Sequence, residues 1–301
     1  MSVMKHLPEV TLRAIDIRLP MVALAALQRS MASTGCARVL LLGHGNLGDQ
    51  AEDGIARIDV GPIESLEAYS DFMLRHLLSW IDTSHGLMAQ WDGFVADAAH
   101  WDPAFLEVDY LSARWGKAPE GQRVGNGGFS LRSRRLLQAL QDPHFAGRLH
   151  HPEDICISQT LRTELERRHG IVFGSLEMAR RFAGENEVVS HDCFGFHGVA
   201  NLPRQMAAPA FGAMIGQLPA AVIAGRGGFK AARALRRQGF DFDLIDAHYF
   251  YPDGVAAALL ARALGRPFVV TARGSDLNVL GRDPVARSLM RWAAKRAAAS
   301  I

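Results

Sequence analysis

Short apolar runs alternate with helical patterns over the first two hundred residues. Apolar positions predict strands at Val10 to Ile15 and Val39 to Leu42, with a helix opened by proline over Pro20 to Met31 between them. Apolar side chains gather near one face of Glu64 to Trp80, which predicts a second helix, and a strand at Gly86 to Gln90 follows. This alternation is typical of an α/β fold with a largely parallel central sheet.

Two aspartates directly follow predicted strands. Asp16 comes after the first strand and Asp92 after a later one, and ligands of open α/β sheets bind outside the carboxyl ends of their strands. A carboxylate beside Gly93 suits a divalent metal, Mn or Mg, that bridges the phosphates of a nucleotide sugar. The alternative for Asp92 is a turn aspartate that hydrogen-bonds its own backbone.

A glycine-rich run, Gly125-Asn126-Gly127-Gly128, forms the next candidate. Glycines at this density indicate positive φ or a close approach of the backbone, and the Asn126 amide is suited to a sugar hydroxyl. The alternative is a tight loop ahead of a helix predicted over Leu131 to Leu140.

An acidic pair and a histidine complete the candidate chemistry. Glu153 and Asp154 are adjacent, so on a helix they diverge by about 100° and only one readily faces a cleft, where it would be the general base for an acceptor hydroxyl. The alternative is that they form a first-turn acidic pair after Pro152, which the helix dipole favours. His197 is a candidate metal or phosphate ligand, or else a satisfied core histidine.

Composition narrows the class of protein. The chain has 301 residues, enough for two units, and 33 Lys+Arg against 31 Asp+Glu leave a net charge of only +2, which argues against nucleic acid as a partner. Its 3 cysteines lack metal-ligand spacing, and no signal-peptide core or membrane-spanning apolar run is present, so we expect a cytoplasmic protein.

Residues 9 to 198 resemble a family of uncharacterised bacterial and fungal proteins with a GT-A-type glycosyltransferase fold. The motifs that carry the resemblance are Gln90 to Gly93, Asp109 to Trp115, Gly125 to Arg132, and Glu153-Asp154, with Phe194 to Gly198 after them.

The resemblance implies roles for the candidate residues. It places Asp92 at the metal-binding carboxylate, His197 at a late metal-ligand position, and Glu153 or Asp154 at the catalytic base. By the same resemblance, the donor or acceptor sugar is lined by Asn126, Gly127 and Gly128.

The chain also departs from the family pattern. Gln90 holds the first place of an Asp-x-Asp pair, which argues against strong metal dependence. Ser112 and Arg114 replace the usual glycine and proline, so we expect a remodelled loop there.

Beyond residue 200 the composition shifts to Ala, Pro and Gly, and a second α/β pattern follows. It predicts helices at Arg226 to Gln238 and Gly254 to Leu264, and strands at Leu244 to Ala247 and Pro267 to Thr271. We therefore divide the chain into domain 1–198, connector 199–225 and domain 226–301.

The last segment resembles the acceptor half of a GT-B glycosyltransferase of family 4. The matching residues are Asp246 to Gly254 and Thr271 to Asn278, and the chain ends just as another strand begins. The nucleotide-binding half of that fold is absent, so His248, Arg273 and Asp276 are not expected to form a complete site. On the final helix Arg287, Arg291 and Lys295 recur every four residues, as on a solvated face or a peripheral contact with anionic lipid at the inner face of the membrane.

Two hypotheses follow. The first is a glycosyltransferase that moves a sugar from a nucleotide-sugar donor to a hydroxyl of a glycan or lipid-linked acceptor. The second is a non-catalytic glycan- or nucleotide-binding module within a larger assembly.

Overall fold

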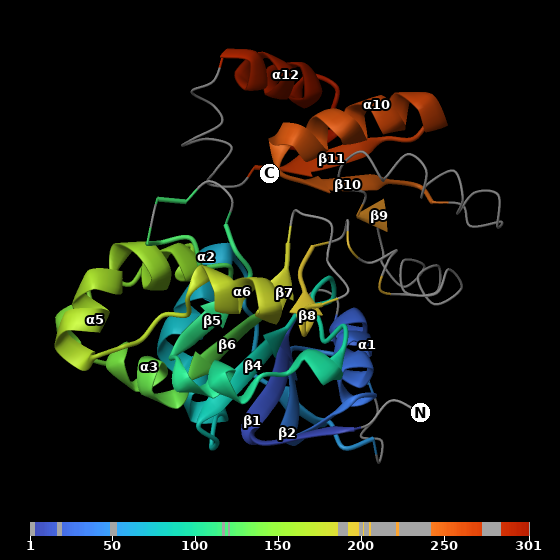
Figure 1. Ribbon diagram of the computed structural model, residues 1–301. Helices are drawn as coiled ribbons and strands as arrows, with labels where there is room; N and C mark the ends of the chain where they lie inside the picture. Colours follow the sequence, from blue (N-terminus) through green and yellow to red (C-terminus); the bar gives the residue numbers. More distant parts are fainter. Residues whose placement is uncertain are drawn as a thin grey trace. The chain divides into compact units, whose positions relative to one another are not determined.

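The computed structural model divides the chain into two compact units, Met1–Asn201 and Leu202–Ile301 (Figure 1). It describes residues 4–16, 20–48, 53–115, 118–119, 121–185, 192–198, 201, 205, 221–222, 242–272 and 284–300. The predicted connector lies almost wholly outside these ranges, so its boundaries stay a prediction.

Unit 1 is built on a six-stranded sheet in the order β3-β2-β1-β4-β6-β5. The strands are β1 (Lys5–Ile15), β2 (Thr34–Gly43), β3 (Ala56–Asp59), β4 (His85–Ala89), β5 (Tyr110–Ser112) and β6 (Ser130–Ser133). The first four strands pair in parallel, as expected, whereas β6 runs antiparallel to both β4 and β5. The expectation of an α/β fold is confirmed, but its central sheet is mixed.

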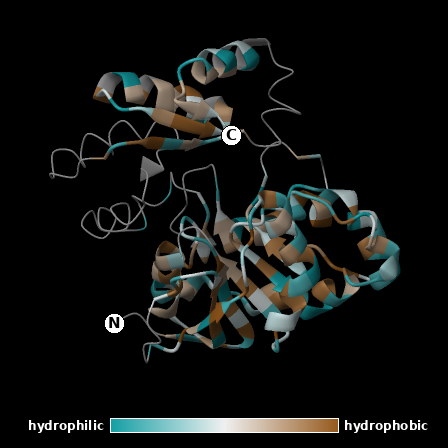
Figure 2. Cartoon of the chain, turned by 180° about the vertical axis from the view of Figure 1, so that it is seen from behind, coloured by the Kyte–Doolittle hydropathy of each residue, from teal (hydrophilic) through white to brown (hydrophobic). Residues whose placement is uncertain are grey.

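Helices cover both faces of this sheet (Figure 1). They are α1 (Pro20–Met31), α2 (Leu66–Asp71), α3 (Arg134–Ala139), α4 (Glu153–Ile155), α5 (Arg162–His169) and α6 (Leu176–Phe182). Apolar residues of α1 and α6 share one core with Leu12 of β1, and those of α3 and α5 share the other with Ile15. Because side chains alternate along a strand, Val10, Leu12 and Ala14 of β1 enter the first core, and Ile15 enters the second. Figure 2 shows these central strands as largely hydrophobic.

Sequence and structure agree closely at several helix ends. Helix α1 begins at Pro20 and ends at Met31, the predicted bounds. In place of the single helix predicted over Glu64 to Trp80, three helical segments follow one another. The α-helix α2 is followed by a π-helical segment at Phe72–His76 and a 3-10 segment at Leu77–Trp80.

The start of the helix predicted over Leu131 to Leu140 was wrong. Leu131 lies in β6, and α3 starts only at Arg134 because Ser133 caps it, its hydroxyl accepting a hydrogen bond from the Leu136 N–H. Ser130 to Ser133 is thus a strand that carries the glycine-rich run directly into the sheet.

Unit 2 holds a four-stranded parallel sheet in the order β12-β11-β10-β9. Its elements are β9 (Ala221–Val222), β10 (Ile245–His248), α10 (Val255–Leu264), β11 (Phe268–Thr271), α12 (Pro284–Ala294) and β12 (Ala299–Ser300). Apolar residues of β10, β11 and α10 form its core. The helix predicted over Arg226 to Gln238 lies outside the described residues.

Within the described ranges, no helix combines the length and the apolar character needed to cross a bilayer.

Candidate active site

The two strand-end aspartates lie where the topology predicts. Asp16 follows β1 and Asp92 follows β4, and these strands pair in parallel. Asp92 sits in a tight turn closed by hydrogen bonds between Gln90 and Gly93, N to O at 2.7 and 2.9 Å. Burial raises the pKa of Asp92, and the Asp16 carboxylate adds to that rise.

The glycine-rich run passes between the other candidate residues. A β-carbon at Gly128 would lie 2.1 Å from His197 Nε2, and one at Gly127 would lie 2.7 Å from Glu153 Oε1. None of Gly125, Gly127 and Gly128 has a positive φ, so these positions require glycine for close approach and not for backbone conformation. This loop thereby brings the acidic pair and His197 to opposite sides of itself.

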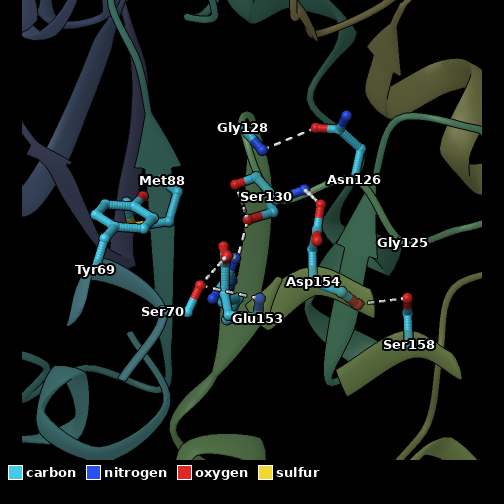
Figure 3. Close-up of polar contacts among 12 residues, drawn as sticks. Tyr69, Ser70, Met88, Gly125, Asn126, Gly128, Ser130, Glu153, Asp154 and Ser158 are labelled. Atoms are coloured by element: carbon cyan, nitrogen blue, oxygen red, sulfur yellow. Dashed lines mark hydrogen bonds and ion pairs between the residues drawn. The ribbon is translucent and has the colours of Figure 1, made fainter. Parts of the chain in front are cut away.

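Asn126 supports the loop from within. Its Oδ1 accepts a hydrogen bond from the Gly128 N–H at 2.8 Å, as the close-up in Figure 3 shows. The nitrogen of its side-chain amide can donate to a ligand hydroxyl. Phe129 anchors the end of the loop by stacking on Phe182, with ring centroids 5.2 Å apart.

Glu153 and Asp154 point to different surroundings (Figure 3). Glu153 is buried, at 7% exposed, and its Oε1 lies 3.2 Å from Arg132 Nη2. Asp154 is partly exposed, and its Oδ2 accepts a hydrogen bond from the Gly127 N–H at 3.2 Å. Adjacent residues at a helix start therefore diverge, as their geometry requires.

The surroundings of Asp154 change its proton affinity. Burial, reinforced by the negative charge of Glu153, raises the pKa of Asp154 to about 7. Burial of Arg132 lowers the pKa of its guanidinium, whereas the nearby Tyr110 and Glu153 raise it. The net result is a raised pKa. A carboxyl that titrates near neutral pH can accept a proton from a hydroxyl and release it again.

His197 is held between carboxylates. Its Nδ1 lies 3.1 Å from Glu185 Oε1, and its Nε2 lies 3.5 Å from Asp92 Oδ1 and 3.3 Å from Gln90 Oε1. Burial alone would lower the pKa of His197, but Asp92 and Glu185 raise it to about 9. The imidazole is therefore protonated at neutral pH.

His197 would have to lose a proton before either ring nitrogen could bind a metal ion, and its role as a metal ligand stays a prediction. In the described part of the chain, no group of three or more His, Cys, Asp or Glu side chains is placed to hold a metal ion. Asp92 remains the residue that a hard cation would prefer, and the role of a metal stays a prediction.

Two buried arginines were not predicted from the sequence as site residues. Arg13 of β1 and Arg132 of β6 are both 0% exposed. Within the described residues Arg13 Nη1 and Nη2 and Arg132 Nη1 have no hydrogen-bond partner, and Arg13 Nε faces Met88 Sδ at 2.9 Å. Burial and the nearby Arg132 charge lower the pKa of Arg13 well below its ordinary value. A charged residue inside the apolar run Val10 to Ile15 was the available signal.

Three further residues join the site without belonging to any motif. Ser70 of α2 lies 3.4 Å from Glu153 Oε2, Tyr69 lies 3.5 Å from the Gln90 amide nitrogen, and Glu185 pairs with His197. None carried a distinctive sequence pattern.

In unit 2, His248 Nε2 lies 3.5 Å from Asp246 Oδ2 at the end of β10. Arg273 and Asp276, which were named with His248 as residues not expected to form a complete site, lie outside the described residues.

Comparison with known proteins divides the chain at residue 197. Residues 54–197 match a family described as a protein of unknown function (DUF5672). Residues 197–301 match a glycosyl transferase 4-like domain. The second match agrees with the predicted GT-B family 4 resemblance. No curated protein matches the chain.

Two solved structures show a weak likeness. The glycosyltransferase GlyE of Streptococcus pneumoniae TIGR4 has a TM-score of 0.36 at 13% identity, over 88% of this chain and 75% of that one. Its apo form has a TM-score of 0.38 at 12% identity, over 98% and 80%. Scores at this level do not decide between GT-A and GT-B folds.

Proposed function

We propose that the chain is a glycosyltransferase whose unit 1 moves a sugar from a nucleotide-sugar donor to a hydroxyl of a glycan or lipid-linked acceptor. The observation that carries the proposal is Asp154, a carboxyl with a pKa of about 7 beside a glycine-rich loop. The match of residues 197–301 to a glycosyl transferase 4-like domain supports the same class of reaction.

In the proposed reaction, Asp154 takes the proton of the acceptor hydroxyl while that oxygen attacks the anomeric carbon of the donor sugar. The bond between that carbon and the donor phosphate breaks, and the nucleoside diphosphate leaves with the electron pair. Asn126, Gly127 and Gly128 would line the sugar, because their loop runs directly past Asp154. Asp16 and Asp92, at the strand ends, would lie toward the nucleotide, where a divalent cation on Asp92 would neutralise phosphate charge.

The GT-A assignment of unit 1 is part of this proposal. Five strands that share one direction, with the antiparallel β6 between β4 and β5, form the sheet, and Asp16 and Asp92 follow its neighbouring strands β1 and β4. In the same way, we propose that residues 226–301 are a partial GT-B acceptor domain, which the parallel sheet of unit 2 supports.

An anionic membrane is a proposed peripheral partner of α12. Arg287, Arg291, Lys295 and Arg296 are exposed, and Arg296 stacks on Trp292 with its Cζ 4.4 Å from the ring centroid. Basic residues beside an aromatic ring suit the headgroup region of a bilayer. Sedimentation with phosphatidylglycerol vesicles, compared with phosphatidylcholine vesicles, tests the contact, and equal binding to both would contradict it.

The decisive experiment for the function is donor turnover by the purified chain. A panel of nucleotide sugars is incubated with and without manganese, and release of nucleoside diphosphate is measured. Turnover that Asp154→Asn abolishes supports the enzyme. Saturable donor binding without turnover would instead support a non-catalytic binding module.

A further inference from the structure

Glu153 is clamped from two directions. Arg132 Nη2 lies 3.2 Å from Oε1, and the Ser70 hydroxyl lies 3.4 Å from Oε2. The backbone N–H of Glu153 also donates to the Ser70 hydroxyl at 3.3 Å. Ser70 in turn lies 2.9 Å from His151 Nδ1, so α2 and the chain before α4 are joined at this point. A carboxylate that is 7% exposed and held this firmly is poorly placed to meet an acceptor.

Asp154 faces a different set of groups. Its two oxygens accept from the backbone N–H groups of Gly127 at 3.2 Å and Ile155 at 2.8 Å. Three other charged side chains act on it or respond to it: Glu153, Arg132 and His197. Burial raises the pKa of the Tyr110 phenol, and the charge of Asp154 adds to that rise. Glu153 is the negative charge that acts most strongly on Asp154.

We propose that Glu153, clamped between Arg132 and Ser70, is a positioning residue that tunes Asp154, the group that takes the acceptor proton. The inference rests on the proposed function and names how its base is prepared. The two neighbouring carboxyl groups thus have different roles: Glu153 positions, and Asp154 exchanges the proton.

The tuning has an electrostatic part. The Glu153 carboxyl is held beside Asp154 by Arg132, whose Nη2 lies 3.2 Å from Oε1. After burial, the negative charge of Glu153 is the largest contribution that raises the pKa of Asp154, because a like charge disfavours a second one.

The tuning also has a steric part. Gly127 fits between the two acids, because a β-carbon there would lie 2.7 Å from Glu153 Oε1 and 3.1 Å from Asp154 Cβ. Glu153 therefore limits where the loop can lie, and the Gly127 N–H that the loop carries fixes Asp154 Oδ2.

The test is a direct titration of Asp154 in the full chain. Aspartate labelled with ¹³C at the carboxyl is followed by NMR, and Asp154→Asn assigns the signal. We expect a midpoint near 7 in the parent chain. Glu153→Gln should lower it by about one pH unit or more, because the like charge is gone. Glu153→Asp, which keeps the charge, should restore a high midpoint.

A matched control removes a different paired acid. Glu164→Gln breaks an ion pair with Arg148 on the surface and should leave the Asp154 midpoint unchanged. If Glu153→Gln does not fold because Arg132 is left unpaired, the double variant Arg132→Met/Glu153→Leu replaces the pair by apolar side chains. The midpoint should fall there too, but by less, because the lost Arg132 charge lowers the pKa of Asp154 in the parent chain. A midpoint that stays near 7 in either folded variant overturns the proposal.

The titration needs no turnover, which separates this inference from the proposed function. A lowered midpoint in a chain that turns over no donor leaves the tuning intact and refutes the transferase. Conversely, turnover whose acid limb stays in place on Glu153→Gln supports the transferase and refutes the tuning.

Discussion

The acidic pair shows how far two adjacent residues of the same charge can differ. Glu153 has an arginine partner and little exposure, whereas Asp154 accepts hydrogen bonds from the backbone N–H groups of Gly127 and Ile155 beside a negative charge. Asp154→Asn should therefore keep donor affinity and cut turnover by about 10² to 10⁴, the usual contribution of a positioned base. Initial rates and donor affinity of the same preparation measure the two effects.

Glu153→Gln should reduce turnover less and should shift the acid limb of the pH profile to lower pH. Glu164→Gln serves as the control for removal of an acid elsewhere. Parent-like turnover in both Asp154→Asn and Glu153→Gln would return the pair to the role of a helix start.

Asp92 supports a second test at the residue scale. Asp92→Asn should abolish the manganese-dependent tightening of nucleoside diphosphate binding, because an amide lacks the anionic oxygen that a hard cation prefers. Calorimetry with and without manganese measures it, and Asp82→Asn, at an exposed surface pair with Arg38, is the control. Equal manganese dependence in the parent and the Asp92 variant would remove Asp92 from the metal site.

At the scale of the elements, β1 and β4 are fitted to each other through Arg13 and Gly86. A β-carbon at Gly86 would lie 2.5 Å from Arg13 Nη2, inside a packed interior. Gly86→Ala should therefore destabilise unit 1 by about 1 to 3 kcal/mol, the usual cost of overpacking. Urea unfolding of the variant measures the loss.

Removal of the arginine provides the critical comparison. In an Arg13→Met background, Gly86→Ala should cost much less, so the double-mutant cycle should show a large coupling. Gly147→Ala is the matched control, since nothing lies within 4 Å of a β-carbon there. An equal cost of Gly86→Ala in both backgrounds would show that the guanidinium is not the obstacle.

The elements also show what local pattern can and cannot predict. Helix α1 was predicted at its true bounds because proline opens it and apolar spacing continues to Met31. The helix after the glycine-rich run was started too early, because Leu131 fits a helical pattern equally well and only pairing with β4 makes it a strand. A strand this short gives no periodic signal of its own.

The candidate site divides in the same way. Asp16, Asp92 and His197 were singled out because each stands beside glycine or at a strand end, and Asp154 because it belongs to an acidic pair after Pro152; their roles stay predictions. Arg13 was missed because it lies in an apolar strand, and such a strand is interpreted as core even when one of its residues is charged. Glu185 was missed because only tertiary packing brings it to His197.

At the scale of the whole molecule, the two raised pKa values predict how stability depends on pH. Asp154 has an ordinary pKa of 3.8 that rises to about 7 in the fold, so stability falls as pH rises between these values. His197 has an ordinary pKa of 6.5 that rises to about 9, so its contribution is complete below 6.5 and is lost as pH rises through 9.

Both groups act in the same direction, and we expect unit 1 to lose stability steadily from about pH 4 to about pH 9. Urea unfolding across that range checks this trend. Asp154→Asn should flatten the lower half of the curve and His197→Gln the upper half. A parent curve that rises with pH would contradict both assignments.

The division into two units predicts where proteases cut. Residues 1–198 should survive as a folded fragment, because both cores of unit 1 are formed by residues before 198. Limited proteolysis should cut first between Leu202 and Gly228, as mass spectrometry of the early fragments would show. First cuts inside residues 1–198 would contradict the boundary.

The packing of Arg13 over Gly86 also constrains how this chain can change by descent. A larger residue at position 86 is tolerated only after position 13 has lost its guanidinium, so one order of substitution is open and the reverse order passes through an unstable intermediate. Related sequences should therefore show the two positions changing together, with glycine at 86 wherever arginine stands at 13. An alignment with arginine at 13 beside a bulky residue at 86 would mean that the backbone has found another way to separate the two strands.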